Sequence, residues 1–489
     1  MASTDPEHPN IVVIVSDDQG PWALGCAGNA ELATPELDRL SAEGTRFDRF
    51  FCASPVCSPA RASLLTGRMP SAHGVHDWIR GEAYGIPDEG GVHYLAGLQT
   101  TPEVLADAGW TCGLAGKWHL GSTRSPAPGF EFWYAHRTGD SPYVGAPVTK
   151  EGRAYQERRY FTDAVTEEAL GFVDSQAASA SPFYLSVNYT APHSPWVGQH
   201  PAEYLDRYAD CDFASCPQEE PHPWFSWEPG PVSNAMLDPR PSLQGYFASI
   251  TAMDAGIGRL LARIDETGLR ESTVVAFVSD NGFSCGQHGI WGKGNATWPL
   301  NLWENSVRVP AIVRQPGRVA AGQITPVLAS ACDLHPTLLS LAGVPVPADP
   351  LAAGRSLVPV LTGTPGADRE AVFAFDEYGG ARMVRTTDRK LVVRAGDLPA
   401  ELYDLEEDPD ERVDLARHHG YAGQVRELEG VLRDWFAAHT DAHRDAFGRA
   451  VSGRGQLCPV TSGADDATTY FQGATERRVG DAARGSTER

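Results

Sequence analysis

The sequence predicts an α/β protein in which a doubly wound, mostly parallel sheet precedes a smaller α+β domain with an antiparallel sheet. Over most of the first 340 residues, short runs rich in Val and Ile alternate with helical stretches. Such continuous apolar runs are typical of parallel strands that helices cover on both faces. After about residue 370 the strand-like runs are shorter and follow one another directly, which predicts the antiparallel sheet.

The elements of the first domain follow in a regular order. The expected strands are at 11–15, 110–116, 182–189, 272–279 and 309–313. The expected helices are at 34–44, from Thr101 onward, at 161–176 and at about 246–266. Because helices separate the strands, the strands are expected to run parallel. Residues 190–240 interrupt this order with many Pro, Trp and Cys, and long insertions of this kind often line binding sites.

We expect three parts along the chain: the first domain at 1–365, the α+β domain at 366–450 and a tail at 451–489. The second part has strand-like runs at 371–378 and 381–395 and a helix near 421–438. The tail is rich in Gly, Ser, Thr and Arg, so we expect it to be partly disordered near its end.

The charge balance excludes several classes of partner. The chain of 489 residues has 40 Lys and Arg against 63 Asp and Glu, which gives a net charge of −23. Nucleic acid or an anionic membrane would require a basic surface, so neither is expected as a partner. No apolar run is long enough to span a bilayer, and no secretory leader opens the sequence. Together with nine scattered cysteines, this predicts a reducing, cytoplasmic location.

Two of the expected strands end in the same way. Asp17 and Asp18 follow the first strand, and Asp280 and Asn281 follow the strand at 272–279. Ligands of open α/β sheets bind outside the carboxyl ends of the strands, so both pairs are expected to face one crevice. Three carboxylates and an amide oxygen suit Ca²⁺ or Mg²⁺ better than a soft metal. The alternative is that each pair is a solvated turn.

A second group of residues surrounds Cys57. Proline at 59 suits the first turn of a helix and a small polar residue would cap it, so a helix is expected to start here. Arg61 follows Cys57 by four residues, so in a helix both side chains would project from the same face. A helix N-terminus beside an arginine is an anion site. The alternative for Cys57 is a small buried apolar residue.

These residues lie in a longer pattern that resembles the sulfatase family. Cys57-Ser58-Pro59-Ala60-Arg61 matches its Cys-x-Pro-x-Arg motif, and LLTGR continues it at 64–68. Further segments occur in the order of the family: SDDQG near the start, GKWHLG at 116–121, APHSP at 191–195, SDNG at 279–282, WGKG at 291–294 and LYDLEEDPDE at 402–411. The resemblance implies an alkaline-phosphatase-like fold, with 1–365 as the catalytic domain.

The resemblance also implies the chemistry of the site. Cys57 would be oxidised to formylglycine by a formylglycine-generating enzyme. It would bind one Ca²⁺, with Mg²⁺ as the alternative, together with Asp17, Asp18, Asp280 and Asn281. Arg61, Lys117 and His119 would surround the hydrated aldehyde, while His193 and Lys293 would contact the sulfate and the leaving oxygen. The substrate would be an aryl, alkyl or carbohydrate sulfate ester.

The residue types suit this chemistry, although each has a plainer explanation. Fixed cations stabilise sulfate oxygens that gain charge as the S–O bond breaks, and Arg61, Lys117 and Lys293 supply three. Taken alone, His119 would be a half-buried histidine, His193 a loop residue between prolines, and Lys293 a surface lysine. Two function alternatives follow: a phosphonate monoester or phosphodiester hydrolase, or a non-catalytic binding protein in which Cys57 is unmodified.

Two further regions bear on the substrate. The stretch NATWPLNLWENSVRVP at 295–310 is longer than in many sulfatases, which leaves the placement of Lys293 less certain. Tryptophans in or near the loops are expected to border the crevice, as platforms for sugar or aryl groups or as packing residues: Trp78, Trp196, Trp224, Trp227, Trp291 and Trp298. His73, His76 and Asp77 either contact substrate hydroxyls or stabilise their loop.

Overall fold

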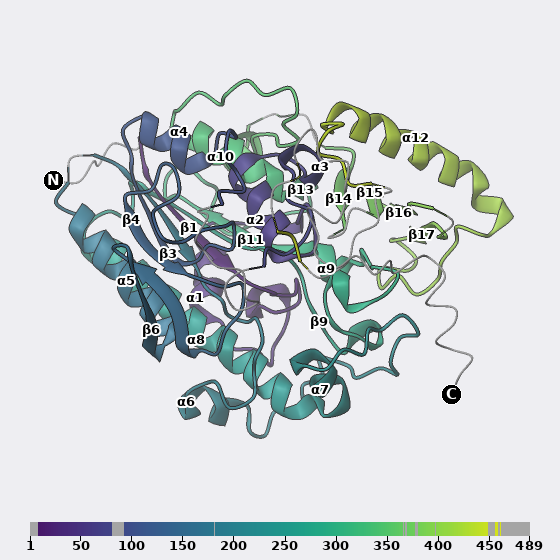
Figure 1. Ribbon diagram of the computed structural model, residues 1–489, viewed down its shortest axis with the longest axis horizontal. Helices are drawn as coiled ribbons and strands as arrows, with labels where there is room; N and C mark the ends of the chain where they lie inside the picture. Colours follow the sequence, from purple (N-terminus) through teal and green to yellow (C-terminus); the bar gives the residue numbers. More distant parts are fainter. Residues whose placement is uncertain are drawn as a thin grey trace.

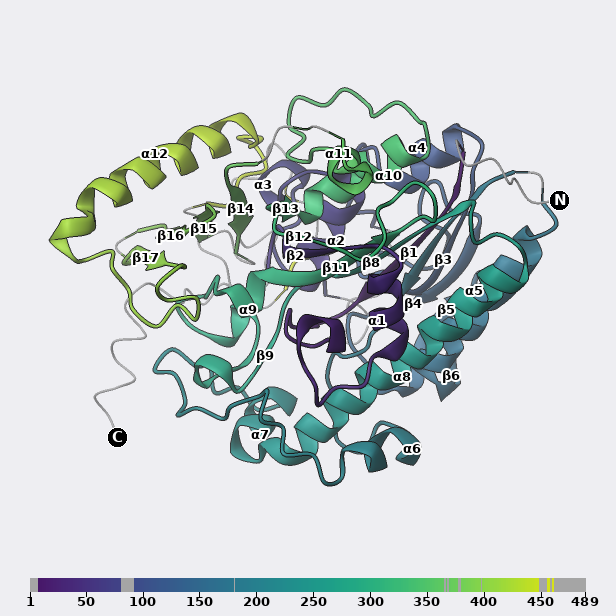
Figure 2. The same ribbon diagram turned by 180° about the vertical axis from the view of Figure 1, so that it is seen from behind.

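We describe a computed structural model of the chain, which covers residues 8–80, 92–179, 181–364, 366, 369–376, 380–396, 398–447, 455–457 and 460. Most of the expected tail at 451–489 lies outside these residues. Figures 1 and 2 show a large central sheet flanked by helices, with a smaller sheet and one long helix at the C-terminal end.

The large sheet has eleven strands, of which the central ones are parallel. In spatial order they are β12 (Gln323–Thr325), β2 (Thr45–Phe51), β11 (Arg308–Arg314), β8 (Thr273–Ser279), β1 (Asn10–Ser16), β7 (Phe183–Asn188), β3 (Thr111–Lys117), β4 (Phe132–His136), β5 (Val144–Lys150) and β6 (Arg153–Tyr160), while β13 (Ala329–Ser330) pairs with β2. The run from β8 to β4 is parallel throughout. This confirms the predicted doubly wound, mostly parallel sheet.

Helices cover both faces of this sheet, as Figure 2 shows. One face carries α1 (Pro35–Ala42), α5 (Phe161–Gln176) and α8 (Pro239–Glu266), and the other carries α2 (Cys57–Thr66), α4 (Thr101–Asp107) and α10 (Leu334–Leu341). Successive side chains of a strand point to opposite faces. Accordingly, Val12 and Ile14 pack in the core below α5 and α8, while Val13 and Val15 pack in the core below α2 and α4. Two buried faces explain the uninterrupted apolar runs.

The sheet also differs from the expectation at both sides. β11 pairs antiparallel with β8 and β2, although its apolar sequence is like that of the parallel strands. β4, β5 and β6 add two further antiparallel pairs beyond β3, where the sequence predicted no strands. β6 forms the edge of the sheet, and most of its residues are exposed. Its buried residues do not alternate with exposed ones. Apolar periodicity therefore does not reveal it.

The C-terminal part is a smaller α+β unit, as predicted. Four antiparallel strands follow in chain order: β14 (Val372–Phe375), β15 (Ala381–Arg385), β16 (Arg389–Arg394) and β17 (Glu401–Asp404). The helix α12 (Ala422–Ala438) packs on them through Leu428, Leu432 and Phe436, which recur every fourth residue. Across 8–447, apart from the gaps given above, no helix combines the length and the apolarity that crossing a bilayer requires.

Shorter elements complete the rim of the large domain. They are α3 (Pro70–His73), α6 (Ala202–Leu205), α7 (Pro231–Leu237), the hairpin of β9 (Ser284–Cys285) and β10 (Trp291–Gly292), α9 (Glu304–Val307) and α11 (Val358–Thr362). The irregular insertion at 190–240 contains α6 and α7 and packs against α8 and the β9–β10 hairpin.

Candidate active site

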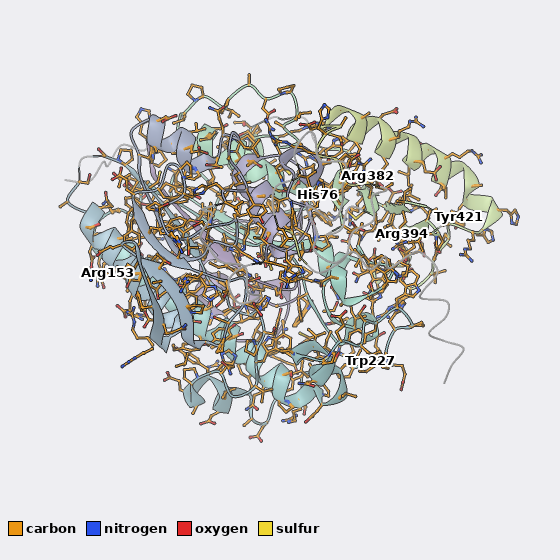
Figure 3. All side chains as sticks on the ribbon, viewed as in Figure 1. His76, Arg153, Trp227, Arg382, Arg394 and Tyr421 are labelled. Carbon is orange, nitrogen blue, oxygen red and sulfur yellow. The ribbon has the colours of Figure 1, made fainter. Side chains whose placement is uncertain are left out.

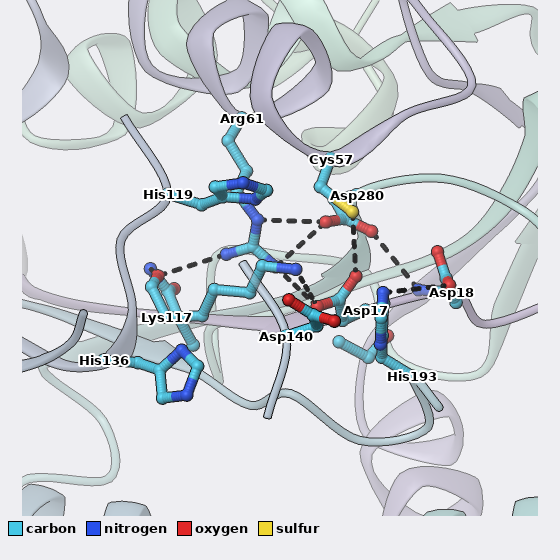
Figure 4. Close-up of polar contacts among 12 residues, drawn as sticks. Asp17, Asp18, Cys57, Arg61, Lys117, His119, His136, Asp140, His193 and Asp280 are labelled. Carbon is cyan, nitrogen blue, oxygen red and sulfur yellow. Dashed lines mark hydrogen bonds and ion pairs between the residues drawn. The ribbon is translucent and has the colours of Figure 1, made fainter. Parts of the chain in front are cut away.

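The two acidic pairs meet at the carboxyl ends of neighbouring strands. β1 and β8 lie side by side in register, with Ser16 opposite Ser279. Asp17 and Asp18 therefore emerge next to Asp280 and Asn281, as Figure 4 shows for the three carboxylates. Asp18 is held in a left-handed backbone conformation (φ 64°), and its N–H donates to Asp280 Oδ1 over 3.3 Å. Strained backbone of this kind concentrates at functional sites.

The helix α2 brings Cys57 to the same place. The helix begins at Cys57 itself, and its N-cap residue Val56 makes no side-chain cap, so the expected polar cap was wrong. Ser58 instead lies inside the first turn, where its Oγ accepts a hydrogen bond from Ile79 N over 3.1 Å. Cys57 Sγ lies 3.2 Å from Asp17 Oδ1 and 3.1 Å from Lys293 Nζ.

Three buried cations face the three carboxylates. Arg61 donates from Nε to Asp280 Oδ2 over 2.9 Å, Lys117 pairs with Asp17, and Lys293 pairs with Asp18. All six side chains are at most 8% exposed. Hydrogen bonds between charged groups are strong and directional when they are shielded from water. The site thus buries three positive charges, each paired with a carboxylate.

The carboxylates differ in how the site treats their charge. Burial would raise the pKa of Asp17, but the positive charges of Lys117, His193 and Arg61 hold it well below its usual range. Burial and the neighbouring Asp17 carboxylate raise the pKa of Asp280 to about 6. Closely spaced carboxylates repel one another, and a cation between them would favour their charged forms.

The donor atoms suit a hard divalent cation. One ligand atom from each of Asp17, Asp18, Cys57 and Asp280 lies within 4.8 Å of the others. Asn281 joins this group, because its Nδ2 donates to Asp18 Oδ1 over 2.7 Å. The set is rich in carboxylate oxygen, which Ca²⁺ and Mg²⁺ prefer. The residues present therefore fit the metal that the sequence predicts.

His119 is placed as a neutral histidine with one free nitrogen. Its backbone is left-handed (φ 54°), and its Nε2 lies 3.0 Å from the carbonyl oxygen of Ile79. A proton on Nε2 leaves Nδ1 as an acceptor, and Nδ1 is buried without a hydrogen-bond partner among the described residues. Burial and the charge of Lys117 lower the pKa of His119 well below its ordinary value. The ring is therefore neutral, with a lone pair on Nδ1 that has no hydrogen-bond partner among the described residues.

His193 lies at the mouth of the site. Its side chain is 19% exposed, and its Nε2 lies 3.7 Å from Asp18 Oδ2. Its Nδ1 is 2.7 Å from the carbonyl oxygen of Ser194, and Tyr143 donates a hydrogen bond to the His193 carbonyl over 2.9 Å. These contacts fix the ring with Nε2 toward the carboxylates, where a substrate oxygen can approach from solvent.

Asn188, which sequence reasoning missed, shares a hydrogen-bond acceptor with Arg61, the backbone carbonyl oxygen of Lys117. It ends β7, and its Nδ2 donates to the carbonyl oxygen of Lys117 over 2.8 Å. Arg61 Nη1 donates to the same oxygen over 3.2 Å, and Ser186 Oγ donates to Asn188 Oδ1 over 2.9 Å. The polar residues at the end of a third parallel strand were the signal that could have revealed it.

Several residues expected near the substrate have structural contacts instead. His73 Nε2 lies 3.0 Å from Ser63 Oγ, and His76 Nε2 bonds the carbonyl oxygen of Arg444. Asp77 accepts a hydrogen bond from Gly455 N over 3.0 Å. Trp196 and Trp291 are 1% and 0% exposed and pack against one another in a core cluster, so they do not border the crevice. Trp227 is 51% exposed, and Trp224 stacks on Trp303.

Comparison with known proteins agrees with the site. A family model described as sulfatase matches residues 9–344, which is more than half of the chain. The chain belongs to the sulfatase family. A second model, described as the C-terminal part of N-sulphoglucosamine sulphohydrolase, matches residues 286–437 of this sulfatase. As a sulfatase, the protein is a sulfuric ester hydrolase.

Individual relatives cover nearly the whole sulfatase. It is 27% identical to an N-acetylglucosamine-6-O-sulfatase of Bacteroides thetaiotaomicron, over 90% of this chain and 88% of that protein. It is 32% identical to human arylsulfatase A, over 87% of this chain and 86% of that protein. The structure is also similar to the phosphonate monoester hydrolase of Agrobacterium radiobacter, with a TM-score of 0.71, 23% identity and coverage of 89% and 97%. The fold alone therefore does not choose between sulfate and phosphonate esters.

Proposed function

We propose that this sulfatase hydrolyses a carbohydrate sulfate ester to an alcohol and inorganic sulfate, with residue 57 as the nucleophile after its oxidation to formylglycine. The observation that supports this most directly is the position of Cys57. Its Sγ lies between Asp17 and Lys293 at the start of α2, with Arg61 on the next turn. Relatives named for sulfated hexosamines, such as the N-acetylglucosamine-6-O-sulfatase, favour a sugar substrate over an aryl sulfate.

The proposal assigns the bound groups as follows. Asp17, Asp18, Asp280, Asn281 and residue 57 would hold one Ca²⁺, which would supply a Lewis acid for a sulfate oxygen and for the nucleophile. The Sγ of Cys57 marks where a hydroxyl of the hydrated formylglycine would lie, and that hydroxyl supplies the oxygen that attacks sulfur. A formylglycine-generating enzyme is the partner that this maturation requires.

The side chains of the chain itself then move the protons. Asp280 accepts the proton of the attacking hydroxyl, since it lies in the ligand cluster with residue 57. His193 or Lys293 donates a proton to the departing sugar oxygen, His193 from the open side of the site. His119 accepts the proton of the second hydroxyl at Nδ1, which releases sulfate and restores the aldehyde. Each proton transfer contributes on the order of 10²–10⁴-fold in rate.

Rates on matched substrates test the reaction class. We expect the purified enzyme to hydrolyse 6-O-sulfated hexosamines and aryl sulfates faster than aryl phosphonates or phosphodiesters. The reason is the sulfatase family match and the sulfatase names of the relatives, because three buried cations would stabilise either kind of anion. A higher kcat/KM on the phosphorus esters would overturn the proposal and favour the phosphonate hydrolase alternative.

The state of residue 57 separates an enzyme from a binding protein. Conversion of the thiol to the aldehyde lowers the mass of the peptide that contains residue 57 by about 18 Da. We expect this loss in active protein, measured by peptide mass spectrometry after reduction, and Cys52 serves as the internal control. An unshifted peptide in a preparation without turnover would support the binding-protein alternative.

A cytoplasmic location remains part of the proposal. The eight described cysteines are all free thiols.

Removal of the metal should abolish turnover and lower stability together. When the divalent metal ion is removed, the carboxylates of Asp17, Asp18 and Asp280 repel one another in a buried site. We expect EDTA to stop hydrolysis and Ca²⁺ to restore it, with a stabilisation of about 2.7 kcal/mol at a hundredfold excess over Kd. Calorimetry and initial rates measure both, and turnover that resists exhaustive chelation would contradict the assignment.

A further inference from the structure

The segment that follows Lys293 is an ordered loop, although its sequence departs from the pattern of many sulfatases. Residues 294–303 connect β10 to α9, and Figure 1 shows α9 between the large sheet and the C-terminal sheet. Lys293 itself contacts Asp18, Asn281 Oδ1 (3.4 Å) and Cys57 Sγ (3.1 Å). Such a long, flexible side chain is held in one place only if its backbone is also held.

Asn301 holds that backbone. Its side chain is fully buried, and its Nδ2 lies 3.0 Å from the carbonyl oxygen of Lys293, 3.2 Å from that of Gly294 and 3.1 Å from Thr297 Oγ1. Two hydrogens are shared among these three acceptors. The backbone N–H of Asn301 also donates to Gly294 O over 3.2 Å. The Asn301 side-chain amide therefore binds one end of the loop at 293–301 to the other, next to Lys293.

The orientation of the Asn301 amide is itself fixed. Ser306 in α9 donates from Oγ to Asn301 Oδ1 over 2.7 Å, so the nitrogen must face Lys293. Ser306 is fully buried as well. An Asn side chain with both ends bonded in this way has a single rotamer and a single flip state.

The C-terminal sheet supports the same loop from its other side. Arg394 in β16, labelled in Figure 3, donates from Nη2 to the carbonyl oxygen of Leu300, next to Asn301, over 2.9 Å. Lys390 in the same strand contacts Glu304 at the start of α9 over 3.3 Å and Glu411 over 2.8 Å. Glu411 in turn accepts a hydrogen bond from Glu304 N over 2.6 Å. Buried charges therefore anchor the loop and α9 to the second domain.

We propose that Asn301 is a positioning residue for Lys293, and that through it the C-terminal domain holds this cation against residue 57. The inference rests on the proposed function for its catalytic consequence, but its structural part stands on the loop contacts alone. A positioning contact that slips by about 1 Å can cost on the order of a hundredfold in rate. Asn301 is fully buried and would act through its contact with the Lys293 carbonyl oxygen.

Variants of Asn301 and a nearby asparagine test the proposal. Asn301→Ala removes the three contacts, and Asn301→Asp keeps the shape but sets an oxygen against two carbonyl oxygens. Asn305→Ala is the matched control, because Asn305 lies on α9 itself and no side-chain hydrogen bond joins it to the described residues. Ser306→Ala frees the amide to rotate and should give a smaller change in the same direction.

Three measurements are made on each folded variant: kcat and KM on a sulfate ester, hydrogen exchange of the amides at 293–301, and the rate at which an amine-acylating reagent labels Lys293. We expect Asn301→Ala and Asn301→Asp to lower kcat about 10- to 100-fold with a smaller change in KM. They should also speed exchange and labelling several-fold, while Asn305→Ala matches the wild type.

Exchange and labelling at wild-type rates in both Asn301 variants would overturn the proposal, as would equal changes in Asn305→Ala. If Asn301→Ala does not fold, Asn301→Asp and Ser306→Ala decide by the same measurements. A wild-type protein without sulfate ester turnover would instead refute the proposed function. Exchange and labelling would still test whether Asn301 holds Lys293.

Discussion

At the scale of single residues, Cys57 and Asp280 both end up inside the protein, although each stands at the end of an element. Cys57 is 3% exposed and Asp280 is fully buried. Burial and the Asp17 carboxylate raise the pKa of the Cys57 thiol, so the unmodified residue is neutral. Asp280 instead forms the close ion pair with Arg61. Removing the Cys57 side chain takes away a small neutral group. Removing the Asp280 carboxylate deprives the buried Arg61 of its closest ion-pair partner.

This difference predicts distinct effects on stability. Cys57→Ala should abolish turnover and change the free energy of unfolding by about 1 kcal/mol or less, since the side chains are similar in size. Asp280→Ala should abolish turnover and lower that free energy by about 3 kcal/mol, because Arg61 remains buried with only the longer ion pair to Asp17, over 3.8 Å. Urea denaturation and initial rates measure both. Asp280→Asn preserves the shape but replaces one of the two accepting oxygens with an N–H donor, so it separates the loss of charge from the loss of volume. Equal stabilities of the two alanine variants would contradict the argument.

At the scale of elements, the site depends on how closely β3 approaches β7. Gly116 precedes Lys117 and adopts φ 114°, and a Cβ there would lie 1.9 Å from the carbonyl oxygen of Asn188. Only glycine allows this approach, which lets Asn188 reach the Lys117 carbonyl. Similarly, Gly139 packs against His119, since an added Cβ would lie 2.3 Å from its Cε1. The motif Gly-Lys-x-His thus encodes a backbone requirement as well as two functional side chains.

Gly116→Ala should therefore reduce both stability and turnover. The added methyl group would force β3 away from β7, and we expect a loss of about 2–4 kcal/mol with at least a tenfold lower kcat. Gly145→Ala is the matched control, because Gly145 also has a positive φ (87°) but open space around its Cβ position. It should cost only about 1 kcal/mol of backbone strain. Thermal melts and rates check this, and equal losses in the two variants would show that strain alone is responsible.

The elements also show where sequence patterns were sufficient. The predicted parallel strands and the helices α1, α5 and α8 were found because apolar residues recur on their buried faces. β6 was missed because it is an exposed edge strand with charged side chains. β4 and β5 were missed as well, although four of the five residues of β4 are buried. The direction of β11 was also not predictable, because its apolar sequence is the same whether its neighbours run parallel or antiparallel.

At the scale of the whole molecule, stability depends on several histidines that are buried in neutral form. Burial lowers the pKa of His136, His200 and His335 to about 4. In the unfolded chain these groups would titrate near 6.5, so the unfolded state binds more protons between about pH 6.5 and 4. The stability contributed by neutral burial is complete above pH 6.5 and is lost as the pH falls through this window.

We therefore expect each of these three groups to lower the free energy of unfolding, by up to about 3 kcal/mol, as the pH falls from 6.5 to 4. Asp254, Asp280 and Glu411, whose pKa values are raised to about 7, 6 and 7, contribute in the opposite direction, so each variant is compared with the wild type. Urea denaturation at several pH values measures the slope. His200→Gln should reduce the slope, while His443→Gln, at an exposed position, should leave it unchanged. Equal slopes in His200→Gln and the wild type would contradict the prediction.

The sequence by itself determined the fold class and predicted the motif residues that the structure brings together, but not Asn188, because strand and helix patterns and short motifs are local properties of the chain. Only the tertiary structure decided how these residues face one another. Sites such as the Asn301 amide on Lys293, or Asn188 on the carbonyl that Arg61 also binds, join segments whose spacing has no local pattern. The same holds for Trp196 and Trp291, which pack in a core rather than along the crevice. Long-range packing fixes these contacts, and it depends on the whole chain at once.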